Sequence, residues 1–491
     1  MRNGVFNVAR TAGILALAVL LQVSSAGAAG LPNQSYPTDL AFQIISPQMD
    51  AAHHNQPHAL AGYLLLAGNG TFGFWDISDP FRPARASEFL SPYRFGEAES
   101  HTISFRKRPD GALEAVTISG RGVDFWDVTD PRSPRLLSSM LLEGVDYGDA
   151  TAAVWGVFWE GRYVYVGGTN TGLHVVDAAD AAHPVLVTRV PTAAFGDVSA
   201  GPVFALGNLL VITTPKNTAG VATLDISDPA HPTLLDFEKP ATASYIGGFY
   251  GRHAHLLTPY RTYDVTTDPA NIALVGSAET PASEYMSFAD GYLFLGALRP
   301  RPGVFKIDIA DPNHLVFVGK VNGRIAFNID DQFSVPIGNL LVISDDQANY
   351  GSVLAVHDSA RDTTPPTVAY VNPPDGAANQ ALTSRVGLSF TDQIDLTTVD
   401  PTTLIVRPVG GAPLTGAWGH MQTLVTFWPD APLAPDTTYE VLVPAGGITD
   451  LVGNAIPATF RSVFSTGAAV DALGCGIAGL SPVTPGEAAA F

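Results

Sequence analysis

Short apolar segments alternate with turns rich in Gly, Asp and Pro along most of the chain. One phrase recurs: an apolar strand, a Gly-rich turn, an apolar strand ending in Asp, a turn that usually carries Asp-Pro, and another apolar strand. The first copy reads GYLLLAGNGTFGFWDISDPFRPARASEF from Gly62. Six further copies follow at spacings of about 40 to 50 residues, beginning at Leu113, Arg162, Asn208, His253, Tyr292 and Asn339. A fixed period of this length is typical of repeat folds.

Each period contains one more short strand between the copies, such as AVWGVFW (Ala153 to Trp159) or GPVFAL (Gly201 to Leu206). Four short strands per period are the content of one propeller blade. The turn residues agree, because the Asp that closes the third strand can accept hydrogen bonds from nearby backbone amides, and the following Pro stops the strand. The pattern therefore predicts an all-β protein with a seven-bladed β-propeller.

The last copy stops after three strands, where the chain continues into RDTTPPTV. Upstream of the first copy, AFQIISP (Ala41 to Pro47) is a strand without a blade of its own. We expect this N-terminal strand to complete the last blade and so close the ring. Closure removes the unpaired strand edges that an open array would expose.

The repeated phrases VVDAADAAHP, TLDISDPAHP and FWDISDPFRP resemble the LVIVD-repeat family of bacterial exported propellers. The resemblance covers about residues 41–360, within a propeller domain expected at residues 41–361, and implies a propeller fold at the cell surface or in the envelope, without an established reaction. The repeats differ from WD40 repeats, since the pairs Trp75-Asp76 and Trp126-Asp127 lie in the middle of the repeat and have no Gly-His partner.

A second domain follows a Pro-rich hinge at residues 362–368. Its strands recur at regular spacing over residues 369–467, as in an Ig-like β-sandwich. The phrases PPTVAYVNPPDGA, LAPDTTYEVLV, ITDLVGN and FSTG resemble the bacterial Ig-like domain of surface proteins, which implies a spacer or stalk. We expect Asp450 and Asn454 to fix the backbone of the ITDLVGN turn, with a calcium site there as the alternative. The tail, 468–491, either frays or begins a further module.

The N-terminus has the three parts of a secretory signal peptide over residues 1–29: the basic residues Arg2 and Arg10, the apolar run TAGILALAVLLQV, and the small residues SSAGAAG. An uncleaved anchor helix is the alternative. A linker, 30–40, leads into the propeller. No later stretch is long and apolar enough to cross a membrane, so we predict a bacterial protein that is secreted, periplasmic or attached to the cell surface. The single cysteine, Cys475, excludes an internal disulfide.

The chain is acidic, with 26 Lys and Arg against 46 Asp and Glu and a net charge of −20. Removal of the signal takes away two arginines and no acids, which brings the net charge to −22. A field of this sign repels nucleic acid and anionic lipid and attracts cations. Nucleic acid is therefore excluded as the main partner.

Carboxylates precede several inner strands, where the loops of a propeller meet at the mouth of its channel. They would form an oxygen-lined site suited to Ca²⁺, or they simply keep an acidic surface solvated, since no DxDxDG motif is present. Aromatic residues on the same strands either pack in the core or stack a sugar ring. The candidate ligand-binding residues are Glu97, Glu99, Asp149, Asp197, Glu284, Asp331, Trp155 and Tyr285.

Three histidines on different repeats, His58, His101 and His255, form a second candidate site. Imidazoles that meet in the channel would hold copper, zinc or iron; the alternative is that all three are structural. The chain has neither a GxSxG elbow nor an HExxH motif. We therefore predict a binding or scaffold protein with a propeller head on an Ig-like stalk, whose partner is an envelope or extracellular protein or polysaccharide. The alternative is a metal-dependent extracellular or periplasmic hydrolase or oxidase with its site in the channel.

Overall fold

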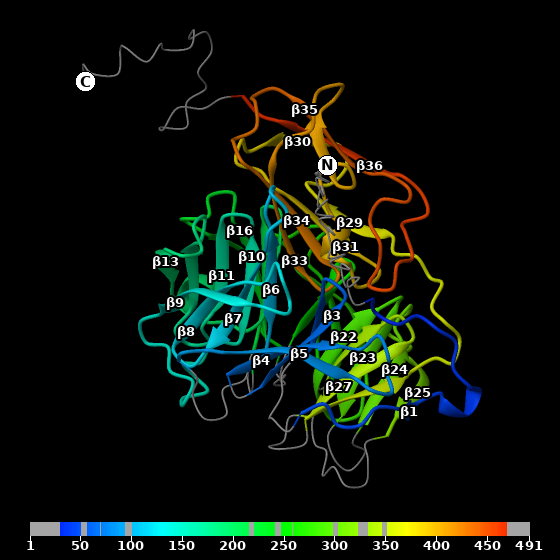
Figure 1. Cartoon of the computed structure of the whole chain (residues 1–491). Helices are drawn as coiled ribbons and strands as arrows, with labels where there is room; N and C mark the ends of the chain where they lie inside the picture. The colour runs from blue at the N-terminus through cyan, green and yellow to red at the C-terminus, as the bar shows by residue number, and fades with distance from the viewer. Residues whose placement is uncertain are drawn as a thin grey trace, which may run out of the picture.

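The computed structural model describes residues 30–50, 56–68, 70–93, 101–215, 220–240, 247–257, 259–297, 303–322, 332–345 and 351–468 (Figure 1). The predicted signal peptide and almost all of the predicted tail lie outside this part of the chain. The described residues are nearly all strand and turn. They contain three short 3₁₀ helices, η1 (Thr38–Leu40), η2 (Thr192–Phe195) and η3 (Leu396–Thr398). No helix in the described ranges has the length and apolar character to cross a membrane.

The repeats form antiparallel four-stranded sheets whose strands follow chain order from the inner to the outer edge. The first three are β2 (His58–Leu60), β3 (Tyr63–Gly68), β4 (Thr71–Asp76), β5 (Ala84–Leu90); β6 (Ile103–Lys107), β7 (Leu113–Ser119), β8 (Gly122–Asp127), β9 (Arg135–Leu141); and β10 (Gly156–Glu160), β11 (Tyr163–Gly167), β12 (Leu173–Asp177), β13 (Val185–Val190). The next three are β14 (Val203–Leu206), β15 (Leu209–Thr213), β16 (Val221–Asp225), β17 (Thr233–Glu238); β18 (Gly248–Tyr250), β19 (His253–Leu256), β20 (Tyr260–Asp264), β21 (Ala273–Ala278); and β22 (Ser283–Ala289), β23 (Tyr292–Ala297), β24 (Gly303–Asp308), β25 (Val316–Val321).

The last repeat supplies only three strands, β26 (Gln332–Ile337), β27 (Leu340–Asp345) and β28 (Ser352–Val356). The fourth strand of this sheet is β1 (Gln43–Ile44), which pairs antiparallel with β28. The prediction that the N-terminal strand completes the last sheet is confirmed. The first strands of several successive sheets contact one another, namely β6 with β10, β10 with β14, β18 with β22 and β22 with β26, as expected for the radial blades of a β-propeller.

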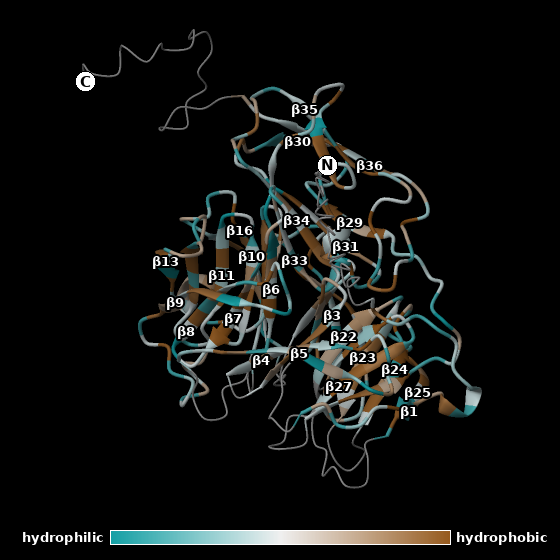
Figure 2. Cartoon of the chain, viewed as in Figure 1, coloured by the Kyte–Doolittle hydropathy of each residue, from teal (hydrophilic) through white to brown (hydrophobic). Residues whose placement is uncertain are grey.

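The sequence pattern explains how each sheet is built. Its inner strands are buried on both faces and are mostly apolar, as in β3 (YLLLAG), and Figure 2 shows hydrophobic residues along β23 and β24; the fourth strand, such as β5, is largely exposed. The Asp that closes each third strand accepts a backbone hydrogen bond two residues on, as in Ser78 N to Asp76 Oδ1 (3.0 Å) and Thr129 N to Asp127 Oδ1 (3.1 Å). The predicted Asx turns are therefore present, and they start the return to the outer strand.

The C-terminal domain is a sandwich of two sheets. One contains β29 (Val368–Asn372), β31 (Val386–Phe390), β34 (Leu424–Pro429) and β33 (Gly416–Met421). The other contains β30 (Ala377–Gln380), β36 (Phe460–Thr466), β35 (Thr438–Val443) and β32 (Ile405–Pro408). This agrees with the Ig-like domain that the sequence predicted.

The position of this domain differs from the predicted stalk. Strand β33 pairs antiparallel with β6, the inner strand of the second blade, so that the sandwich sheet and the blade form one continuous sheet (Figure 1). Residues of both domains also share one hydrophobic core, in which Phe105 and Leu113 of the blade lie with Trp418 and Phe427 of the sandwich. The Ig-like domain is packed onto the propeller because β33 has an unpaired edge and an apolar face, and both are buried by this contact.

Two glycines permit the close approach of the two domains. A Cβ atom on Gly419 of β33 would collide with the carbonyl oxygen of Trp159, and one on Gly161 would collide with the side chain of Trp428. The hinge region is also held by the N-terminal linker. Asn33 accepts a hydrogen bond from Asp362 N (2.9 Å), and Tyr36 N donates to the carbonyl oxygen of Ser359 (2.7 Å).

Candidate functional site

The aromatic residues that sequence analysis placed at the channel are buried and stacked in pairs. The Trp155 ring lies 3.9 Å from His101 at 15°, and the Tyr285 ring lies 3.6 Å from Phe333 at 27°, measured between ring centroids. His101 and Phe333 are 6.0 Å apart, which joins the two pairs into one group at the inner strands. We call these four residues the aromatic cluster. The aromatic cluster contains three of the predicted site residues, Trp155, Tyr285 and His101. They pack against one another as core side chains and do not form an open surface on which a sugar ring could stack.

The carboxylates predicted at the channel mouth are described only in part. Asp149 and Asp197 are exposed in the loops that lead into β10 and β14. Asp149 Oδ1 accepts hydrogen bonds from Thr151 N (2.9 Å) and Oγ1 (2.7 Å), and these bonds lower the pKa of its carboxyl group. Glu97, Glu99, Asp331 and the side chain of Glu284 lie outside the described residues. The predicted acidic ring therefore stays a prediction.

The three candidate metal-binding histidines lie in separate surroundings. His58 Nε2 accepts a hydrogen bond from Ile103 N (3.2 Å), His255 Nδ1 is bonded to the Tyr260 hydroxyl (2.7 Å), and His101 belongs to the aromatic cluster. Burial lowers the pKa of both His58 and His255 to about 3, so both rings are neutral. The structure does not bring these histidines together.

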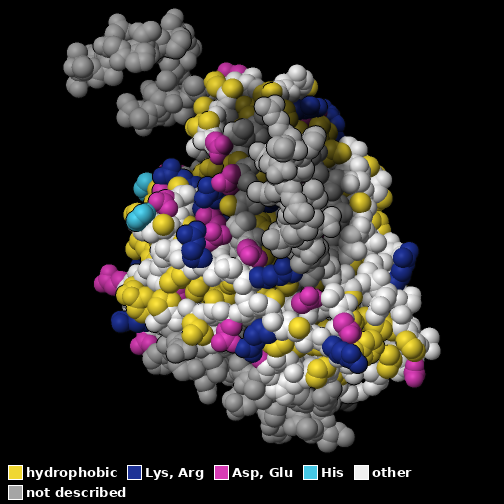
Figure 3. All heavy atoms as spheres, viewed as in Figure 1, with side chains coloured by type: hydrophobic (Ala, Val, Ile, Leu, Met, Phe, Trp, Pro, Cys, Tyr) yellow, Lys and Arg dark blue, Asp and Glu magenta, His cyan; other side chains and the backbone are white. Residues whose placement is uncertain are grey.

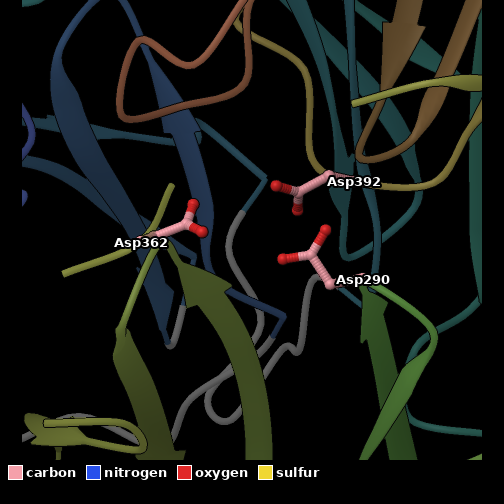
Figure 4. A group of neighbouring side chains, drawn as sticks. All are labelled: Asp290, Asp362 and Asp392. Carbon is pink, nitrogen blue, oxygen red and sulfur yellow. The ribbon is translucent and has the colours of Figure 1, made fainter. Parts of the chain in front are cut away.

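A different group of titratable side chains does converge. Oxygen atoms from Asp290, Asp362 and Asp392 lie within 4.8 Å of one another (Figure 4), and this is the one group of three or more His, Cys, Asp or Glu in the described ranges that is compact enough to hold a metal ion. We call these three residues the acidic cluster. Asp290 is in the turn between β22 and β23, Asp362 follows the last propeller strand, and Asp392 follows β31 of the Ig-like domain.

Neighbouring polar groups hold the acidic cluster in place. Asp362 accepts hydrogen bonds from Thr364 N (2.9 Å) at Oδ1 and from Asn454 Nδ2 (3.0 Å) at Oδ2. The same Asn454 amide donates to Asp450 Oδ2 (2.7 Å), which brings a fourth carboxylate close to the group. Asp450 Oδ1 also accepts from the amides of Val452 and Asn454, so its predicted role in the ITDLVGN turn is confirmed.

Ionisation of the carboxyl groups in the acidic cluster is unfavourable in the protein without a bound cation. Burial, followed by repulsion from Asp362 and Asp450, raises the pKa of Asp290 to about 7. Burial and repulsion from Asp290 and Asp450 raise the pKa of Asp392 well above its usual range, and burial raises that of Asp450 to about 6. Carboxylates shifted in this way favour either a shared proton or a bound cation.

A cavity of about 340 Å³ adjoins the acidic cluster and is lined by Asp290 and Asp362 together with Lys306, His357 and Asp358. The Lys306 ammonium is bonded to His357 Nδ1 (3.2 Å) and lies 3.9 Å from Asp358. It is not within ion-pair distance of the acidic cluster among the described residues, but its charge opposes part of the rise in the pKa of Asp290.

A buried ion pair also joins the two domains. Arg385 Nε lies 3.0 Å from Glu160 Oε2, and both side chains are 0% exposed. Arg385 also donates to the carbonyl oxygen of Ile226 (2.7 Å), and its guanidinium lies 4.6 Å from the ring centroid of Trp428. Burial, only partly opposed by Arg385, raises the pKa of Glu160 to about 7.

Two parts of the chain match models of known families. The LVIVD repeat matches residues 153–192 and 207–236, and the bacterial Ig-like domain matches residues 362–466. The chain thus combines LVIVD repeats with a bacterial Ig-like domain. No curated protein matches it.

Similar solved structures include the Cps50 (Swd1) β-propeller domain of Myceliophteria thermophila, with 13% identity and a TM-score of 0.46 over 63% of this chain and 98% of that one. A chain of the mitotic checkpoint complex has 12% identity and a TM-score of 0.43 over 70% of this chain and 100% of that one. The Sqt1 protein of Saccharomyces cerevisiae has 10% identity and a TM-score of 0.41 over 66% and 99%.

Proposed function

We propose that this chain is an exported, non-enzymatic binding scaffold of the bacterial envelope, built as a seven-bladed propeller with an Ig-like domain packed on one of its faces. Its partner is an envelope or extracellular protein or polysaccharide. Contacts of the Ig-like domain with the turns after three inner strands, at Gly161, Gly207 and Asp290, carry this proposal, since they leave the loops at the other ends of these strands accessible. The LVIVD repeats and the Ig-like domain both support a surface location.

Among the described residues, the accessible face includes the loops that lead from β9 to β10 and from β13 to β14. Asp149 and Asp197 are exposed there, and the protein as a whole is acidic. Figure 3 shows acidic, basic and hydrophobic side chains interspersed over one side of the molecule rather than segregated. A mixed surface of this kind suits recognition through several moderate contacts, with the acidic loops favouring a neutral or basic partner.

The test is co-sedimentation of the mature chain with isolated peptidoglycan sacculi and with purified capsular polysaccharide. We expect saturable binding to one fraction, and weaker binding by the double variant Asp149→Lys, Asp197→Lys. The matched control is Asp375→Lys, Asp430→Lys, which changes the charge by the same amount on the Ig-like domain. Equal binding by both double variants would refute the role of the acidic loops, and retention by neither fraction would refute a polysaccharide partner.

A further inference from the structure

The acidic cluster lies where three separate parts of the chain meet. Asp290 belongs to the propeller, Asp362 to the connection, and Asp392 to the Ig-like domain. The backbone holds them together, since Asp290 N donates to the carbonyl oxygen of Thr391 (2.7 Å), the residue before Asp392. Anything that binds all three carboxylates therefore acts on the packing of the two domains.

Two of the three carboxylates, those of Asp392 and Asp290, have an oxygen atom without a hydrogen-bond partner among the described residues. The Asp392 side chain is only 5% exposed and points towards Asp290 and Asp362 (Figure 4). Oδ1 accepts one hydrogen bond, from Gln393 N (2.7 Å), and Oδ2 accepts none from the described residues. Asp290 Oδ1 is likewise buried without a hydrogen-bond partner in this part of the chain. Buried carboxylate oxygens are costly unless a donor or a cation meets them.

We propose that the acidic cluster binds one Ca²⁺ ion, which fixes the Ig-like domain to the propeller. The donors are all carboxylate oxygens, which are ligands for hard cations rather than for copper or zinc. They come from three independent segments, and the adjoining cavity gives water access to the remaining coordination positions. This irregular, partly hydrated arrangement suits Ca²⁺, whose geometry is flexible, better than Mg²⁺, which requires a near-ideal octahedron.

The ion changes the energetics of domain packing. Without a cation, packing brings three carboxylates together and removes Asp392 from water. With Ca²⁺ the same approach creates the binding site, so binding and packing are linked. This inference does not depend on the proposed partner and can hold or fail independently of it.

The experiment uses the mature chain, residues 30–491, stripped of metal with EDTA and dialysed. Calcium binding is measured by isothermal titration calorimetry and by thermal unfolding with and without CaCl₂. We expect one ion per chain, a higher Tm in calcium, and a smaller rise in MgCl₂. The variants Asp392→Asn and Asp290→Asn should each weaken calcium binding at least tenfold. Asp375→Asn, an exposed Asp of the Ig-like domain, is the matched control and should bind as the wild type does.

The metal-free proteins show whether a variant simply fails to fold. Asp392→Asn keeps the shape of the side chain and removes a charge, so in EDTA it should unfold at the same temperature as the wild type or higher. Calcium should also slow tryptic cleavage after Arg361, in the connection, for the wild type and not for Asp392→Asn. Absence of binding at millimolar calcium, or equal weakening by Asp375→Asn, would refute the site.

Discussion

Removal of the Arg385 side chain tests how far the packing of the two domains determines the stability of the whole chain. Arg385 and Glu160 are both fully buried and lie on opposite sides of the contact, 3.0 Å apart. In Arg385→Met the aliphatic stem is kept, and the charge and its hydrogen bonds to Glu160 and Ile226 are lost. Breaking one partner of such a pair leaves a buried, uncompensated carboxylate, at a cost of about 3–5 kcal/mol.

The loss of stability in Arg385→Met should depend on pH, because it depends on the charge of Glu160. In the wild type the pKa of Glu160 is already raised to about 7. This folded-state pKa lies above the pKa of Glu160 in the unfolded chain. The contribution of Glu160 to the free energy of unfolding is therefore fully present below the unfolded pKa, and it is lost as the pH rises through about 7. Without Arg385 the pKa of Glu160 rises further, so the variant should lose more stability between pH 5 and pH 8 than the wild type does.

The assay is urea unfolding of the mature chain, followed by tryptophan fluorescence at both pH values. The double variant Glu160→Gln, Arg385→Met removes both charges and should recover much of the free energy of unfolding lost in the single variant. The reasoning would be refuted if Arg385→Met lowered the free energy of unfolding by less than about 1 kcal/mol, or if the effects of Arg385→Met and Glu160→Gln were strictly additive.

Three further predictions concern the same contacts. Gly419→Ala places a methyl group against the Trp159 carbonyl, so it should separate β33 from β6 and speed tryptic cleavage after Arg361, whereas Gly467→Ala, with only ordinary contacts, should not. Deletion of residues 30–47 removes β1 and leaves the edge of β28 unpaired, so light scattering should show aggregation that the intact mature chain does not show. His255 is buried with a pKa lowered to about 3, so its contribution is present above the unfolded pKa and is lost as the pH falls. Between pH 6 and pH 4, His255→Gln should therefore lose less stability than the wild type, by up to about 1.4 kcal/mol per pH unit; equal slopes in urea titrations would contradict this.

The repeat could be predicted from the sequence because its signals are local. The alternation of apolar strands with Asp-containing turns is complete within each period, and the turn bonds of Asp76 and Asp127 form between residues two apart. The closing role of β1 was also predictable, since one strand was missing at the end of the array and one was left over at its beginning. Asp450 and Asn454 could be identified because their bonds lie within one turn.

The acidic cluster could not be predicted in the same way. Asp290 occupies a turn between two propeller strands, where the second blade also carries an Asp (Asp110), and nothing near it in sequence indicates Asp362 or Asp392. Tyr285 was correctly placed on an inner strand, β22, whereas Trp155 lies just before β10 and not in it, and the stacking partners of both residues come from other blades. Contacts between repeats depend on the ring geometry, and contacts between domains depend on docking. Neither leaves a periodic signal in the chain.

The interdomain contact explains why the Pro-rich connection does not act as a spacer. A stiff segment holds two domains apart only when neither has a surface that gains free energy by burial against the other. Here the edge of β33 pairs with the second blade, and Trp418 and Phe427 share a hydrophobic core with residues of the propeller. The Arg385–Glu160 pair and the acidic cluster then give the contact its specificity, because each requires groups from both domains at defined positions. Polar groups of this kind contribute little net stability when paired and a large penalty when separated. The two domains of the wild type are therefore expected to unfold as one cooperative unit, whereas loss of either polar contact should uncouple them, so that the connection around Arg361 is exposed before the propeller melts.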